Sequence, residues 1–234
     1  MKELKTNYIR QDVIKMLAQK GGHTASNLSV VDVFAALCKT AKPTDKILVS
    51  EHLTPALQAT LAHIGHFSKK QLLQPTKKLP EGTKYPLSTA IGMAHSARID
   101  GKQTKAYCVI NDDEHQQGHV WEAAMHAGKH KLNNLMLIIN RNNVQENGYV
   151  ENIMSLEPLN AKYAAFNWHV IEVDGHNQQH IKEAFAEAHP AKPTVIIAHT
   201  IPGKGVSFIE NKYEWHAKTP TKQEETEAIT ELQK

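Results

Sequence analysis

The chain has 234 residues, of which 41% are hydrophobic and 22% charged, and its formal net charge is +3. This length suits one large α/β domain or two small ones, and the weak, scattered positive charge does not indicate nucleic-acid binding. No stretch approaches the roughly 18 apolar residues of a membrane span, and the polar start lacks the apolar core of a signal peptide. We therefore expect a cytoplasmic protein that binds neither membranes nor nucleic acid.

Helix-like and strand-like patterns alternate along the chain. Apolar spacing predicts helices at 6–20, 29–40, 53–67, 88–101, 119–130 and 178–189, and a polar helical surface segment at 221–234. Short apolar runs predict strands at 45–51, 106–110, 134–140, 168–175 and 193–200, with a long loop and a short turn near 155–163. Nearly continuous apolar strands between helices indicate an α/β fold, with a mostly parallel sheet covered by helices on both faces. We treat residues 1–234 as a single domain.

The two cysteines lie in apolar surroundings. Cys38 falls in a predicted helix and Cys108 in a predicted strand. We expect buried thiols rather than a disulfide or a metal site.

Polar side chains follow two of the predicted strands. Asn111, Asp112 and Asp113 come after one strand, and Asn142 follows the next. Ligands bind parallel sheets beyond the carboxyl ends of the strands, and a carboxylate with an amide oxygen suits Mg²⁺ or Ca²⁺. The simpler alternative is that these residues only cap a helix and form an Asx turn.

From residue 10 to about 218 the chain resembles the N-terminal, diphosphate-binding domain of transketolases. The resemblance rests on motifs that occur in the family's order: GGHTASNLS at 21–29, VSEH at 49–52, NDDEHQQGHVWEA at 111–123, NRNNVQENG at 140–148, MSLEPL at 154–159, VDGH at 173–176, GKGVSF at 203–208 and WH at 215–216. One motif alone would be weak evidence, whereas the ordered set is strong.

The resemblance implies a thiamine diphosphate cofactor held through Mg²⁺ or Ca²⁺. The residues that match the family's metal ligands are Asp112, Asn142 and the carbonyl of Val144. His23 and His216 match catalytic histidines, and the implied cofactor contacts are His52, Glu81, Gly82, Thr83, Asp112, Asp113, Gln117, Asn142 and His216. Other histidines, such as His63, His126 and His189, are expected to be solvated or packed against helices.

Several positions depart from the family pattern. Asn111 and Asp113 replace both glycines of Gly-Asp-Gly, Gln117 replaces a glutamate, and Thr24 replaces a proline. Asp113 would bring a second carboxylate close to the diphosphate, where like charges repel. The segment between Gln74 and Ile91 is shorter than in the family, which should open the site. Its lysines Lys77, Lys78 and Lys84 are expected to be solvated, and the alternative is that they offer positive charge to a phosphate.

Transketolases continue into a pyrimidine-binding domain and a third domain, and this chain ends before both. We therefore expect a second subunit that carries these domains, a dimer core and an α₂β₂ assembly acting on sugar phosphates. Three hypotheses remain: an active subunit of a two-chain transketolase, a degenerate subunit that binds cofactor and partner with lost or narrowed catalysis, and an unrelated dinucleotide or phosphosugar enzyme. The third is weakest, because no strand is followed by a G-x-G-x-x-G or Walker loop.

Overall fold

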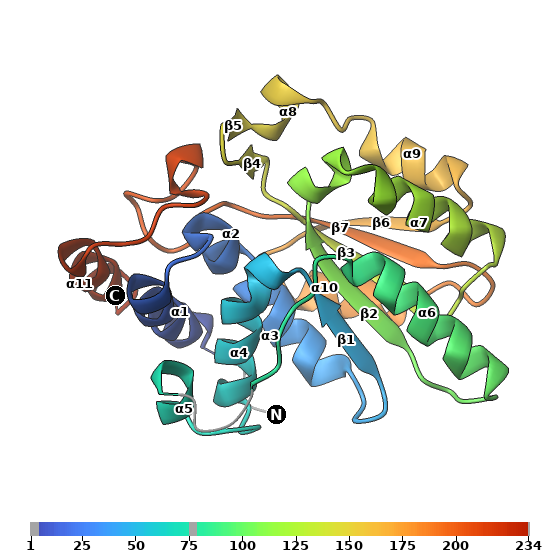
Figure 1. The fold of residues 1–234 in the computed structure, drawn as a ribbon, viewed down its shortest axis with the longest axis horizontal. Coiled ribbons are helices and arrows are strands. Elements are labelled where there is room, and N and C mark those ends of the chain that lie inside the picture. The colour runs from blue at the N-terminus through green and yellow to red at the C-terminus, as the bar shows by residue number, and fades with distance from the viewer. Residues whose placement is uncertain (1–4, 75–78, 234) are drawn as a thin grey trace.

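The computed structural model describes residues 5–74 and 79–233, which contain one five-stranded sheet. The strand order is β1-β2-β3-β7-β6, and every neighbouring pair is parallel (Figure 1). The strands are β1 (Lys46–Val49), β2 (Ala106–Asn111), β3 (Leu135–Arg141), β6 (His169–Asp174) and β7 (Thr194–His199). The predicted parallel α/β sheet is confirmed.

Helices cover both faces of this sheet. The helices are α1 (Thr6–Lys20), α2 (Thr24–Ser29), α3 (Val31–Thr40), α4 (Thr54–His63), α5 (Lys70–Leu73), α6 (Pro86–Ile99), α7 (Gly118–Lys129), α8 (Val150–Ile153), α9 (Leu159–Ala165), α10 (Gln178–Ala186) and α11 (Lys222–Glu231). Short 3₁₀ turns are η1 (Glu51–Leu53), η2 (Asp113–Gln116) and η3 (Tyr213–Trp215), and β4 (Val144–Gln145) pairs with β5 (Gly148–Tyr149) as a small antiparallel hairpin.

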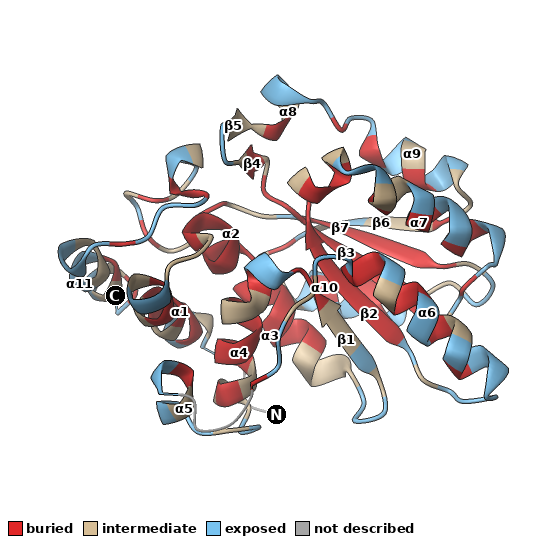
Figure 2. Cartoon of the chain, viewed as in Figure 1, coloured by how far each residue is buried: buried red, intermediate tan, exposed pale blue. Residues whose placement is uncertain are grey.

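Successive strand residues point to opposite faces and so build two cores. Val109 and Ile138 pack with apolar residues of α1, α3, α4 and α10, whereas Cys108 and Leu137 pack with those of α6, α7 and α9. The central strands are buried, while the outer sides of α6 and α7 are exposed (Figure 2). Both cysteines are free, as expected; Cys108 is buried and Cys38 is half-buried.

The structure differs from the predicted elements in several places, of which three bear on the site or the core. Residues 24–29 form α2, a buried helix that the polar TASNLS sequence did not indicate. The predicted long loop contains the β4–β5 hairpin and the short helices α8 and α9. The tail helix α11 is not only a surface segment, because Ala228 and Leu232 are buried and the carbonyl of Leu232 accepts a hydrogen bond from Gln11.

The carboxyl ends of the strands meet at one edge of the sheet. Asn111 lies opposite Asn140, and Arg141 lies opposite His199. The loop after residue 79 returns to this edge, where Thr83 forms a parallel bridge with Ser50 beyond β1. None of the helices among the described residues is both long and apolar enough to cross a membrane.

Candidate active site

Asp112 and Asn142 follow the adjacent strands β2 and β3, as the sequence predicted. The carboxylate of Asp112 accepts a hydrogen bond from the backbone N–H of Asn143, at 2.7 Å. Asn143 has a φ of 60°, a left-handed conformation that asparagine tolerates better than most residues. The two strand ends are thereby linked through the Asp112 side chain.

The Asp112 carboxylate is fully buried and forms an ion pair with the guanidinium of Arg141. Arg141 donates to Oδ2 at 2.6 Å, and the N–H of Asp113 donates to Oδ1 at 3.1 Å. The pKa of Asp112 is raised to about 6, mainly by burial and also by the nearby Asp113, while Arg141 opposes both effects. Asp112 also caps η2, as the simpler alternative predicts.

The asparagines at this edge form a buried polar network. Asn111, which stands where the family has glycine, accepts a hydrogen bond from Asn140 at 2.8 Å through its side chain. The backbone N–H of Asn111 donates a hydrogen bond to the Glu114 carboxylate at 2.8 Å. The pKa of Glu114 is raised to about 8, mainly by burial, although this hydrogen bond lowers it. Asn142 accepts from the N–H of Val144 at 3.1 Å and donates to Ser26 at 3.2 Å. The replacement of glycine by Asn111 is therefore accommodated by a hydrogen bond between neighbouring strands.

Three histidines from distant parts of the chain come together beside these residues. We call His23, His52 and His216 the active-site trio. The ring centroids of His23 and His52 are stacked at 4.1 Å, and those of His23 and His216 lie 4.6 Å apart. Nε2 of His216 lies 3.5 Å from a carboxylate oxygen of Asp113. Burial lowers the pKa of His23 to about 4, with smaller contributions from His216 and His52, so its ring is neutral near pH 7.

The helix α2 holds this trio to the strand ends, and sequence reasoning did not foresee its role. Asn27 donates to the carbonyls of His23 and His52, at 2.7 and 2.8 Å, and accepts from the N–H of Ala56. Thr24, which replaces the family proline, donates to the carbonyl of Lys218 at 2.6 Å, close to His216. The available signal for this role was the polar sequence of α2, because polar residues need hydrogen-bond partners from other segments when they are buried.

The remaining predicted cofactor contacts lie in two places. Residues 81–83 lie beside Ser50, where the N–H of Gly82 donates to Thr54 at 2.9 Å and that of Thr83 to the carbonyl of Val49 at 2.9 Å. A Cβ at Gly82 would lie 2.5 Å from the Ser50 carbonyl oxygen, so only glycine allows this approach. Gln117 is exposed and accepts a hydrogen bond from His119 if that ring nitrogen is protonated.

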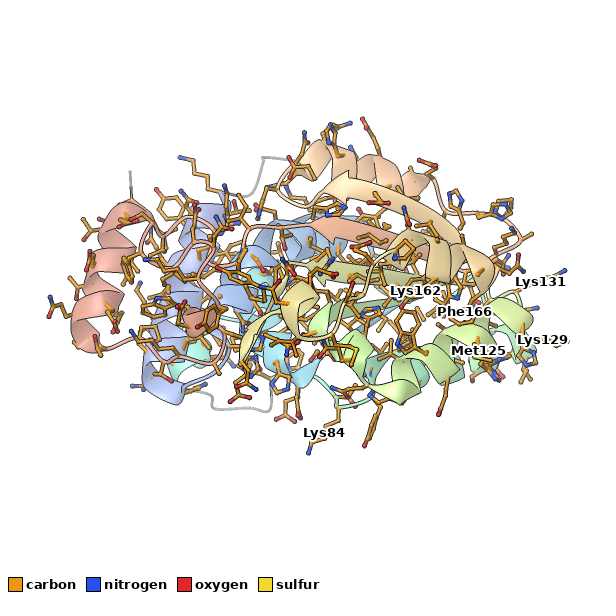
Figure 3. All side chains as sticks on the ribbon, turned by 90° about the horizontal axis from the view of Figure 1, so that it is seen from above. Lys84, Met125, Lys129, Lys131, Lys162 and Phe166 are labelled. Carbon is orange, nitrogen blue, oxygen red and sulfur yellow. The ribbon has the colours of Figure 1, made fainter. Side chains whose placement is uncertain are left out.

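The shortened segment 74–91 is described only in part. Residues 75–78, and with them Lys77 and Lys78, lie outside the described residues. Lys84 is exposed, as expected, and extends away from the domain (Figure 3).

Two cavities open near the carboxyl ends of the strands. One of about 430 Å³ lies where β3, β6 and β7 end, and Arg141, Asn142 and His176 are among its lining residues. It lies at the point where the strand order reverses, the usual ligand position in such sheets. The other, of about 390 Å³, is lined by Glu51, Glu81 and Gly82 among others.

The residues present fit a polar cofactor held through a metal ion. His23 Nδ1, Asp113 Oδ1 and both ring nitrogens of His216 are buried and have no hydrogen-bond partner within the described part of the chain. Buried polar atoms of this kind are costly without a ligand. Asp112 and Asn142 supply carboxylate and amide oxygens with lone pairs to spare, which could hold a hard divalent cation.

Comparison with known proteins identifies the family. Residues 89–232 match the family model described as "Transketolase, thiamine diphosphate binding domain". The chain is 34% identical to the 6-deoxy-6-sulfo-D-fructose transketolase subunit SqwG of Clostridium sp. (strain MSTE9), covering 97% of this chain and 94% of that protein. It is 31% identical to an apulose-4-phosphate transketolase subunit of Phocaeicola vulgatus, covering 98% and 93%.

Full-length transketolases also match, but this chain spans only part of them. It is 30% identical to transketolase of Rattus norvegicus over 97% of this chain and 41% of that protein. The structure of transketolase from Campylobacter jejuni superposes with a TM-score of 0.87 at 24% identity, covering 98% of this chain and 42% of that one, which shows a shared fold. The chain therefore belongs to the transketolase family, as an N-terminal, thiamine diphosphate binding domain.

Proposed function

We propose that the chain is the N-terminal subunit of a two-chain transketolase, which transfers a two-carbon ketol unit from a ketose phosphate to an aldose phosphate. The observation that carries this proposal is the active-site trio beside Asp112 and Asp113 at the joined ends of β2 and β3. It is supported by relatives of nearly the same length that are named transketolase subunits. Sugar phosphates are the proposed substrate class.

Asp112, Asn142 and the carbonyl of Val144 are the proposed ligands of Mg²⁺ or Ca²⁺. The Arg141, Asn143 and Asp113 donors fix the orientation of the Asp112 carboxylate before any ion arrives. A divalent cation would offset the charge of a diphosphate next to Asp113, which a second carboxylate would otherwise repel. When bound, thiamine diphosphate supplies the carbon nucleophile that carries the ketol unit.

The proposed cofactor contacts around this cation are His52, Glu81, Gly82, Thr83, Asp113 and Gln117. Residues 81–83 are supported by their close approach to Ser50 at the strand edge. Gln117 has the weakest support, since it is exposed and paired with His119.

His23 and His216 are the proposed proton-handling residues. The neutral ring of His23 has a buried Nδ1 without a partner among the described residues, which would accept a hydrogen bond from a sugar hydroxyl and so orient that hydroxyl. Nε2 of His216 lies 3.5 Å from a carboxylate oxygen of Asp113, close enough for Asp113 to orient the ring. Asp113 would thus orient a histidine ring, although its negative charge would repel the diphosphate.

A second subunit with the pyrimidine-binding and C-terminal domains is the proposed partner, in an assembly with a dimer core. The proposal is supported by the two relatives of nearly the same length, since each is named as one subunit of a transketolase. The isolated chain should therefore not turn over ketose and aldose phosphates unless that partner is added.

Calorimetric titration of thiamine diphosphate with Mg²⁺ tests the proposal, on the chain alone and with the partner subunit. We expect metal-dependent binding in the mixture and ketol transfer in an assay with sugar phosphates. Asp112→Ala should abolish the binding, whereas Asp100→Ala, an exposed aspartate at the end of α6, should leave it unchanged.

The outcomes separate the hypotheses. Metal-dependent binding without ketol transfer would identify the degenerate subunit instead. Absence of metal-dependent binding in both preparations would refute the active and the degenerate subunit together. An Asp112→Ala variant with unchanged affinity would show that the metal ligands are assigned wrongly.

A further inference from the structure

Three histidine side chains converge on α6 and α7, outside the candidate active site. His95 lies on α6, and His126 and His130 lie four residues apart at the end of α7. Nε2 of His95 and Nε2 of His126 are 3.0 Å apart, and the three ring centroids lie 4.4 to 5.2 Å from one another. We call these residues the α6/α7 trio.

We propose that the α6/α7 trio binds one divalent transition-metal ion of the zinc type. Each residue offers one ring nitrogen, and these nitrogens all lie within 4.8 Å of one another. Zn²⁺ bonds imidazole nitrogen at about 2.0–2.1 Å, so tetrahedral ligands stand roughly 3.4 Å apart. His126 and His130 are exposed and His95 is half-buried, so small rotations of the side chains complete the site.

The backbone beneath the trio is already fixed. Arg98 of α6 donates hydrogen bonds to the carbonyls of His130 and Lys131, at 2.9 and 3.2 Å, and so joins the carboxyl ends of α6 and α7. Asn134 donates to the carbonyl of Ala94 at 3.0 Å, directly before His95. Because these bonds hold the backbone in place, metal binding would require only rotations of the three histidine side chains.

The spacing and the electrostatics favour a cation with nitrogen ligands. Residues four apart on a helix share one face, so His126 and His130 present both rings to the same ion. The carboxyl end of α7 carries a partial negative charge, which favours a cation. The positive charges of Arg98 and Lys129 would repel a cation at this site, although the Arg98 guanidinium donates hydrogen bonds to two carbonyls.

The ligand chemistry separates this site from the one proposed at Asp112. Three imidazoles suit Zn²⁺, Cu²⁺ or Ni²⁺, whereas carboxylate and carbonyl oxygens suit Mg²⁺ and Ca²⁺. The fourth position is left for water or for a group from another molecule. Figure 3 labels Met125, Lys129 and Lys131 along this part of α7 and its following turn, where the surface is exposed to solvent.

Calorimetric titration of the metal-free full chain with Zn²⁺ tests the proposal, with Co²⁺ absorption as a second readout of the ligand geometry. We expect one ion per chain and visible bands typical of tetrahedral nitrogen coordination. His126→Ala and His95→Gln should each weaken Zn²⁺ binding by at least about tenfold, since the loss of even an outer-shell partner typically costs about 10- to 100-fold. Excess Mg²⁺ should not displace the Zn²⁺.

Two matched variants serve as controls. His180→Ala removes an exposed histidine on α10, on the opposite face of the sheet, and His52→Ala removes the exposed member of the active-site trio. Both should keep the wild-type Zn²⁺ affinity. The proposal is overturned if the chain binds no Zn²⁺, if the α6/α7 variants bind it as tightly as wild type, or if His52→Ala is the variant that loses it.

Discussion

The chain holds two groups of three histidines at similar ring distances, and their surroundings are opposite. The residues of the active-site trio lie in different segments at the edge of the sheet. The buried side chain of Asn27 holds the backbone carbonyls of His23 and His52. In the α6/α7 trio the rings stand on helix surfaces, and only their helices are fixed. Polar groups within the active-site trio are buried without partners among the described residues, whereas His126 and His130 are exposed.

The comparison shows that proximity of histidines alone does not define a function. At the sheet edge, burial keeps His23 neutral and leaves its Nδ1 without a hydrogen-bond partner among the described residues. On α6 and α7, solvent allows the rings to turn toward a common ion. The same residue type is therefore suited to acid–base work in one environment and to metal binding in the other.

The largest effect is expected from Asn27→Ala, which breaks the buried support of the active-site trio. The change removes two bonds to the carbonyls of His23 and His52 and leaves the first-turn N–H of Ala56 in α4 without its partner. We expect a loss of about 2–4 kcal/mol in the free energy of unfolding, measured by urea denaturation.

Asn160→Ala is the matched control for this change. Asn160 is exposed on α9 and its partner Glu172 can bond to water instead, so the loss should stay within about 0.5 kcal/mol. Equal losses in the two variants would mean that Asn27 does not support the trio.

A smaller effect is expected on the pH dependence of the stability, through the titration of His23. Its folded pKa of about 4 lies below the ordinary value of 6.5, so the unfolded chain binds the proton first as the pH falls. The stability that the neutral ring contributes is therefore present above pH 6.5 and is lost as the pH falls from 6.5 to 4. The melting temperature of wild type should drop more between pH 7 and pH 5 than that of His23→Asn.

NMR titration of the histidine ring protons checks the same point directly. The His23 resonance should remain at its neutral position at pH 5.5. A midpoint near 6.5 for His23 would contradict the buried environment on which its proposed role depends.

The sequence predicted the sheet and the position of Asp112 and Asn142 at the strand ends, because both follow from local patterns. Apolar runs marked β2 and β3, and polar residues directly after them placed Asp112 and Asn142 at one edge. The helix α2 was missed because its stability comes from buried polar contacts to distant segments, which no periodicity reveals.

The α6/α7 trio was missed for a related reason. His126 was expected to be an ordinary helix-surface histidine, and the i, i+4 pair with His130 did not single it out. His95 lies 31 residues earlier, and only the packing of α6 against α7 brings its ring nitrogen to His126. A site assembled from two helix faces requires tertiary structure before its members can be grouped.

The smallest effect is expected from His126→Ala in the metal-free chain, and it separates the two trios most directly. The change removes the exposed ring of His126 together with its contacts to His95 and His130, and water can replace the ring at both partners. The free energy of unfolding should therefore change by less than about 0.5 kcal/mol without metal. With Zn²⁺ present, wild type should gain stability as the free ion rises above its dissociation constant, and the variant should not. A large loss in the metal-free variant would show that the α6/α7 trio is a structural contact, held by packing as the active-site trio is held by Asn27.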